Sequence, residues 1–145
     1  MKKINVSDAS EQTLNWLVAI CEGFTPADMK RGVGYFVAKD PGKAKYFCHG
    51  AGEGAHSGFA RAGFKPSSNW TQGGVIIDRE DIDIDSNSAR TPRIKSRAVM
   101  TSRIKDSMGF YPRVDAFGPT KLIAAMRCYV IAVKGNEVEI PEEML

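Results

Sequence analysis

The segment GPTKLIAAMRCYVIAVKGNEVEIPEEM, from Gly118 to Met144, has the pattern of a capped helix followed by an acidic tail. Pro119 suits the first position of a helix, because the N–H that it lacks would have no partner there. Lys134 and Gly135 are typical of a helix C-terminus. Between them apolar residues recur at three- and four-residue spacing and small residues fill the other positions: Leu122, Met126, Tyr129 or Val130, and Val133, with Ala124, Ala125, Cys128 and Ala132. We therefore expect a helix that begins near Pro119, ends at Gly135 and is buried on nearly all sides.

The acidic tail after this helix, residues 136–145, alternates glutamates with Val138 and Ile140. A period of two residues predicts a strand, and Pro141 limits it to the edge of a sheet. The strand could pair within the chain or with a second copy, so a homodimer stays open.

The N-terminal region predicts an amphipathic helix. Ser7, Asp8 and Ser10 offer capping oxygens, and Gly23 ends the pattern. Apolar residues follow the cap at positions i, i+3, i+4 and i+7: Leu14, Leu17, Val18 and Cys21.

The middle of the chain predicts short strands and one short helix. Two β-prone runs between Gly32 and Cys48, separated by the turn residues 39–42, indicate a hairpin. Residues 49–63 form a glycine-rich loop. A short helix follows from Trp70 to about Ile77, with Ser67 or Ser68 as its cap, and Trp70 at helical spacing from Ile77 is a core candidate. Ile82 and Ile84 between acids suggest an edge strand, and residues 85–112 read as a polar, basic loop.

Size and composition favour a single domain over residues 1–145. With 43% hydrophobic and 26% charged residues the chain can bury one core. We expect an α/β (α+β) fold in which short antiparallel strands pack with N-terminal, middle and C-terminal helices in one layered domain. The net charge of +3 permits nucleic-acid binding without indicating it.

Cysteine usage and hydropathy indicate the compartment. Cys21, Cys48 and Cys128 are an odd count without a C-x-x-C pair, as expected for reduced thiols. No stretch is long and apolar enough for a transmembrane helix, and the polar N-terminus is unlike a signal peptide. We expect a soluble protein of the cytoplasm that does not bind membranes.

Potential catalytic and metal motifs are weak. Gly50–Ala55 matches G-x-G-x-x-A, but the glycines after it leave no room for the long helix of a dinucleotide site. Cys48, His49 and His56 lack a fourth metal ligand from a paired set. Either histidine could activate Cys48 or Ser57, but no motif frames such a pair. We expect no metal, no cofactor and no enzymatic activity.

Three blocks of sequence carry a family resemblance. Thr13–Gly23, Phe64–Glu80 and Ala116–Met144 closely resemble the NinX-like early proteins of lambdoid phages and prophages, and they are similar to the small phage "ABA sandwich" domain. The blocks cover a little over a third of the chain, and residues 43–63 and 90–112 depart from the family pattern. The resemblance implies a phage or prophage protein that acts in the host cytoplasm, and it carries over no catalytic residue.

The resemblance favours host interference, including counter-defence, by a non-enzymatic binding protein. The partner would be a host protein or a small anionic, nucleotide-like ligand. For such a ligand we expect the glycine-rich backbone and two helix starts to converge on the anion, with Trp70 stacking on a base if it is not a core residue. The candidate ligand-binding residues are Gly50, Gly52, Gly54, Trp70, Gln72, Gly73, Thr120, Lys121 and Arg127.

The alternative is a nucleic-acid-binding accessory protein of phage replication or recombination. Its motivation is the basic run that follows the acidic strand, which is otherwise a solvated face. The residues that would contact phosphate are Arg93, Lys95, Arg97, Arg103 and Lys105.

Overall fold

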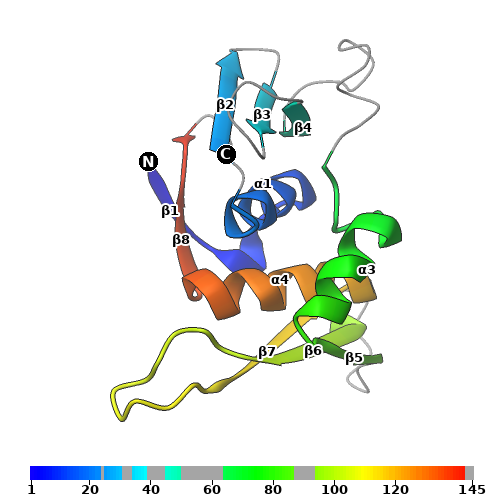
Figure 1. Ribbon diagram of the computed structural model, residues 1–145, viewed down its shortest axis with the longest axis vertical. Helices are drawn as coiled ribbons and strands as arrows, with labels where there is room; N and C mark the ends of the chain where they lie inside the picture. The colour runs from blue at the N-terminus through cyan, green and yellow to red at the C-terminus, as the bar shows by residue number, and fades with distance from the viewer. Residues whose placement is uncertain (24, 31–33, 39–44, 50–63, 87–93, 143–145) are drawn as a thin grey trace.

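The computed structural model describes residues 1–23, 25–30, 34–38, 45–49, 64–86 and 94–142 (Figure 1). In these residues the strands form three antiparallel sheets, β1-β8, β2-β3-β4 and β5-β6-β7, around three α-helices and a short 3-10 helix. The predicted α+β fold with short antiparallel strands is confirmed. The elements are β1 (Lys2–Asn5), η1 (Val6–Asp8), α1 (Glu11–Cys21), β2 (Thr25–Lys30), β3 (Gly34–Ala38), β4 (Lys45–His49), α3 (Trp70–Arg79), β5 (Asp83–Ser86), β6 (Ser96–Thr101), β7 (Arg113–Gly118), α4 (Lys121–Lys134) and β8 (Glu137–Ile140).

Helix α4 is the centre of the core. It lies between α1 on one side and the β5-β6-β7 sheet on the other, with α3 across its N-terminal half (Figure 1). The predicted burial is confirmed, since nine of its residues are buried, from Leu122 to Ala132. The predicted start at Pro119 is wrong by two residues, because the Thr120 hydroxyl accepts the Ile123 N–H at 3.1 Å and so caps the helix. Gly135 ends α4 at a φ of 95°, which glycine adopts without strain.

The β5-β6-β7 sheet places one face on α4. Ala98 pairs with Ala116 and Met100 with Val114 across β6 and β7, and the two alanines and Met100 are buried. Small side chains at the middle of this face let the helix approach the sheet. The predicted acidic edge strand is confirmed as β5, which among the described strands pairs with β6 alone. Strand β6 lies within residues 85–112, so the prediction that this whole segment is a loop is wrong.

The acidic tail forms β8, as predicted, and it pairs with β1 of the same chain. Ile4 lies opposite Val138, and Lys3 forms an exposed ion pair with Glu137 at 3.4 Å. Strand β1 was not predicted, because it is short and begins with two lysines.

The predicted hairpin is confirmed as β3 and β4, which pair antiparallel with β2 as a third strand. The predicted turn at 39–42 and residues 50–63 of the glycine-rich loop lie outside the described residues. Strand β4 lies against α1, so this sheet covers the side of α1 that faces away from α4 (Figure 1).

A buried polar contact joins α1 to Ser67, which lies three residues before the start of α3. Ser10 caps α1 as predicted, by accepting the Thr13 N–H at 3.2 Å. The predicted serine cap of α3 is wrong, since Asn69 accepts the Gln72 N–H at 3.3 Å. Ser67 is instead buried, and its N–H and hydroxyl donate to Asn15 Oδ1 at 3.0 and 2.7 Å. A buried serine needs such a partner, which α1 supplies.

Gly73 and Gly74 are adjacent in α3 and provide a matched pair of substitutions. A Cβ at Gly73 would lie 2.4 Å from the Pro66 carbonyl oxygen and 2.6 Å from Leu122 Cδ2, whereas a Cβ at Gly74 would lie 3.8 Å from its nearest neighbour, in Trp70. We expect Gly73→Ala to lower the free energy of unfolding by about 1–3 kcal/mol through overpacking. Gly74→Ala should raise it by about 0.5–1 kcal/mol. Urea denaturation measures both, and equal midpoints for the two variants would contradict this close approach of α3 to α4.

Candidate functional site

The candidate ligand residues of α3, Trp70, Gln72 and Gly73, lie in its first turn and differ in exposure. Gly50, Gly52 and Gly54 lie outside the described residues. The Trp70 side chain is 54% exposed, so its interpretation as a core residue is wrong. Gly73 is buried against Pro66 and Leu122, which brings the starts of α3 and α4 together.

The polar candidates at the two helix starts make hydrogen bonds within the chain. Gln72 Oε1 accepts the Lys65 N–H at 2.6 Å. Thr120 caps α4, and Arg127 Nη1 donates to the Phe117 carbonyl oxygen at 2.9 Å. Lys121 is exposed at the first turn of α4. Of the described candidates, Trp70 and Lys121 are therefore the ones that are exposed and make none of these hydrogen bonds.

The basic residues of the nucleic-acid alternative do not form one free cationic stripe. Arg93 lies outside the described residues, and Lys95 is exposed. Arg97 lies 3.8 Å from an Asp115 carboxylate oxygen, and Arg103 forms an ion pair with Glu80. Each of these two arginines is thus close to a carboxylate of its own chain.

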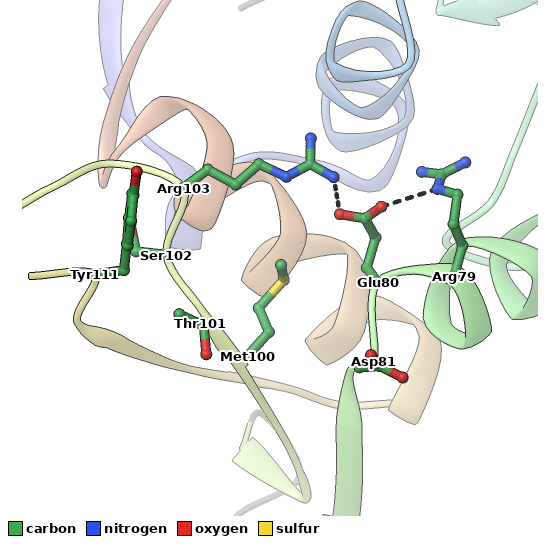
Figure 2. A pocket seen from close by; sticks show the side chains of 8 residues that line it. All are labelled: Arg79, Glu80, Asp81, Met100, Thr101, Ser102, Arg103 and Tyr111. Atoms are coloured by element: carbon green, nitrogen blue, oxygen red, sulfur yellow. Dashed lines mark hydrogen bonds and ion pairs between the residues drawn. The ribbon is translucent and has the colours of Figure 1, made fainter.

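A pocket of about 600 Å³ lies at the base of the β6-β7 hairpin. Figure 2 shows the Glu80 carboxylate between the guanidinium groups of Arg79 and Arg103, with Tyr111 on the opposite side of the pocket from Arg79. Arg79 Nε lies 2.9 Å from Glu80 Oε2, and the Glu80 side chain is only 8% exposed. A nearly buried carboxylate with two arginine partners keeps its negative charge compensated. The remaining lining residues are Asp81, Met100, Thr101 and Ser102.

Tyr129 of α4 joins this pair of arginines to the end of α1. Its ring is 1% exposed, and the guanidinium carbons of Arg79 and Arg103 lie 6.0 and 5.6 Å from the ring centroid. Its hydroxyl donates to Glu22 Oε2 at 2.6 Å, and Arg79 donates to both Glu22 oxygens at 2.9 and 2.5 Å. We call Glu22, Arg79, Glu80, Arg103 and Tyr129 the charge network. It connects α1, α3, α4 and the hairpin.

Two groups of the charge network, Glu22 and Tyr129, have pKa values shifted away from neutral pH. Burial favours the neutral form of Glu22, but hydrogen bonds from Arg79 and Tyr129 outweigh it and hold the pKa of the carboxyl below its ordinary value. Burial, together with the hydrogen bond to Glu22, raises the pKa of the Tyr129 phenol far above its ordinary value. Neither group is suited to exchange protons near neutral pH.

The thiols of the described helices are also unreactive. Burial raises the pKa of the Cys21 thiol to about 11 and that of the Cys128 thiol to about 12. Thiolate is the nucleophilic form, so both side chains are inert at neutral pH. Cys48 and His49 end β4, whereas His56 and Ser57 lie outside the described residues.

Residues 102–112, which we call the projecting loop, extend from the sheet away from the helices (Figure 1). Four large apolar side chains on it are exposed: Ile104 by 44%, Met108 by 79%, Phe110 by 66% and Tyr111 by 52%. The Lys105 ammonium lies 5.6 Å from the centroid of the Tyr111 ring, a cation–π distance. The loop therefore combines apolar side chains with a cation.

The tip of the projecting loop is ordered by Asp106. Its backbone accepts the Gly109 N–H at 3.0 Å and donates to the Phe110 carbonyl oxygen at 2.7 Å. Its Oδ1 accepts the N–H groups of Met108 and Phe110 at 2.9 and 3.0 Å. Gly109 has a φ of 85°, which a residue with a side chain rarely adopts. The tip is thus held by its own hydrogen bonds.

The base of the loop is fixed to α4. The Ser102 N–H donates to the Pro112 carbonyl oxygen and the Arg103 N–H to the Ala132 carbonyl oxygen, at 2.7 and 2.8 Å. The Ser102 hydroxyl accepts the Ile104 N–H at 2.9 Å. Sequence reasoning did not single out Met108, Phe110 and Tyr111. The available signal was Asp106 with Gly109 three residues later, a common turn pattern between two strands.

In the part of the chain that the structure describes, no group of three His, Cys, Asp or Glu side chains is placed to hold a metal ion. Among the described helices, none combines the length and apolar character needed to cross a bilayer.

Glu22→Gln should weaken the charge network in a pH-dependent way. Because the folded-state pKa of Glu22 is lowered, its contribution to stability is present above the ordinary value of 4.5 and is lost as the pH falls through the folded value. We expect the free energy of unfolding of the variant to be about 1–3 kcal/mol lower than that of the unmodified chain at neutral pH. In urea titrations repeated across pH, the difference from the unmodified chain should shrink as the pH falls below the ordinary value of 4.5 and through the folded value. Glu139→Gln, at an exposed position of β8, is the control. A pH-independent difference would argue against a charged Glu22 in the network.

Asp106→Ala should loosen the tip of the projecting loop without unfolding the chain. The substitution removes the acceptor of two backbone N–H groups, so we expect faster hydrogen exchange at the Met108 and Phe110 amides and an unchanged rate in α4. Asp106→Asn keeps an oxygen at Oδ1 and should restore most of the protection. Equal exchange in all three proteins would show that Asp106 does not order the tip.

A search of curated proteins finds no match to the chain. The family model described as "Bacteriophage P22, NinX" matches residues 5–133, which include the charge network and the projecting loop. The chain therefore belongs to the NinX family of bacteriophage proteins.

Proposed function

We propose that this chain is a non-enzymatic accessory protein of the phage that acts in the host cytoplasm by binding a host protein and blocking it. The observation that carries the proposal is the projecting loop, in which Met108, Phe110 and Tyr111 are more than half exposed on an ordered backbone. Exposed apolar side chains grouped on a fixed surface are typical of protein-binding sites.

The chemistry of the described residues supports binding over catalysis. The charge network pairs its carboxylates with arginines, and the pKa shifts of Glu22 and Tyr129 move both groups away from neutral pH. A general acid or base works best with a pKa near the working pH. These residues are better suited to fix the base of the projecting loop than to transfer protons.

The two other candidate functions have less support from the geometry. A small anionic ligand would rely on Trp70 and Lys121, since Gln72, Thr120 and Arg127 make hydrogen bonds within the chain. Nucleic acid would compete with Asp115 for Arg97 and with Glu80 for Arg103. Phosphate binding gains most from cations that have no acidic partner, because they release counterions from the nucleic acid.

The proposal is tested by affinity purification from infected host cells with quantitative mass spectrometry. We expect one host protein to be enriched with the unmodified chain and reduced at least about tenfold with the double variant Met108→Ser, Phe110→Ser. Val75→Ser is the matched control, because Val75 is 62% exposed on α3, away from the loop. The samples are treated with nuclease to remove indirect bridges.

Two results would contradict the proposal. If no host protein is enriched over an unrelated small protein, the chain does not act by binding one. If enrichment disappears with nuclease and the chain shifts DNA at low salt, the nucleic-acid alternative replaces it.

A further inference from the structure

We infer that the projecting loop is a preformed plug, in which Met108 and Phe110 enter an apolar pocket of the host protein while Lys105 faces a carboxylate at the rim of that pocket. The inference rests on the proposed function and deepens it by naming the contact and the chemistry of the partner.

The loop is ordered before it meets a partner. Asp106 holds the Met108 and Phe110 amides, and the Arg103 N–H joins the base to α4 at the Ala132 carbonyl oxygen. Ordering a free loop on binding opposes association, so a loop ordered in advance retains more of its contact energy as affinity. Such rigidity serves a contact that depends on the shape of the tip.

The two side chains that insert are distinguished by exposure and by their neighbours. Met108 and Phe110 are the most exposed apolar side chains of the loop, at 79% and 66%. Tyr111 is less exposed, and the Lys105 ammonium lies 5.6 Å from the centroid of its ring. Tyr111 and Lys105 therefore suit the rim of an interface, and Met108 and Phe110 its buried centre.

The charges around the tip favour a protein as the occupant. Asp106 accepts the N–H groups of both inserting residues, so its carboxylate accompanies them into any surface that receives the tip. Anionic lipid or phosphate would be repelled by this carboxylate, whereas a protein pocket can meet it with N–H or hydroxyl donors. Among the described acidic side chains none forms an ion pair with Lys105, so its charge is available to a carboxylate of the partner.

The test is photo-cross-linking in infected host cells. A photoreactive phenylalanine analogue replaces Phe110 in one full-length variant, Tyr111 in a second and Val75 in a third. We expect adducts with one host protein from positions 110 and 111 and not from 75. The cross-linked peptide from position 110 should contain apolar residues, and the one from position 111 should contain or adjoin Asp or Glu. Lys105→Glu should lower the adduct yield at least about threefold, and the matched change Lys121→Glu should leave it unchanged.

Other outcomes overturn the inference, and they show whether the proposed function fails with it. Adducts with a host protein at position 75 alone would keep the proposed function and remove the loop as the contact. Adducts at 110 with nucleic acid, with lipid or with a second copy of this chain would replace the protein pocket with that occupant. The photoreactive analogue is also placed at the exposed positions 70, 95 and 121. If neither these positions nor 75, 110 and 111 yield an adduct with a host protein, both the inference and the proposed function fail.

Discussion

Burial of α4 on nearly every side is the constraint on which the other elements depend. Its small residues let α1, α3 and the β5-β6-β7 sheet approach one axis, and Gly73 brings the backbone of α3 against Leu122. Dispersion and hydrophobic gains grow with such close contact, and each added methylene at these positions would act on several elements at once. The identity of the small residues therefore matters as much as that of the large ones.

Polar groups then fix the direction of the elements that surround α4. The charge network ties the ends of α1 and α3 to the hairpin through Tyr129. Buried ionic contacts contribute little net stability after desolvation, but leaving one of them unpaired is costly. Their main effect here is geometric, because an alternative orientation of the hairpin would leave Glu80 without Arg103. The orientation of the projecting loop follows from this restriction.

The helices were predictable from sequence because their signals are local. Apolar spacing located α1 and α4, and Ser10 and Gly135 marked their ends. Trp70 was wrongly predicted as a core residue. Helix α3 packs through Gly73 and Ile76, and Trp70 lies three residues before the first of these contacts. The loop at 102–112 carries a local turn signal in Asp106 and Gly109, but the bond that fixes its base, from Arg103 to Ala132, joins residues far apart in the chain and was not predictable. The family resemblance was recognised from short blocks and is confirmed over residues 5–133.

The position of α4 late in the sequence has a consequence for biosynthesis. Among the described elements that pack on α4, only β8 follows it in the chain. During translation α1, α3 and the hairpin therefore emerge from the ribosome before the helix that covers their apolar faces. Until α4 emerges and docks, these faces are exposed, and exposed apolar surface promotes aggregation. The rate at which α4 docks therefore sets how long the unfinished core stays open to chaperones and proteases.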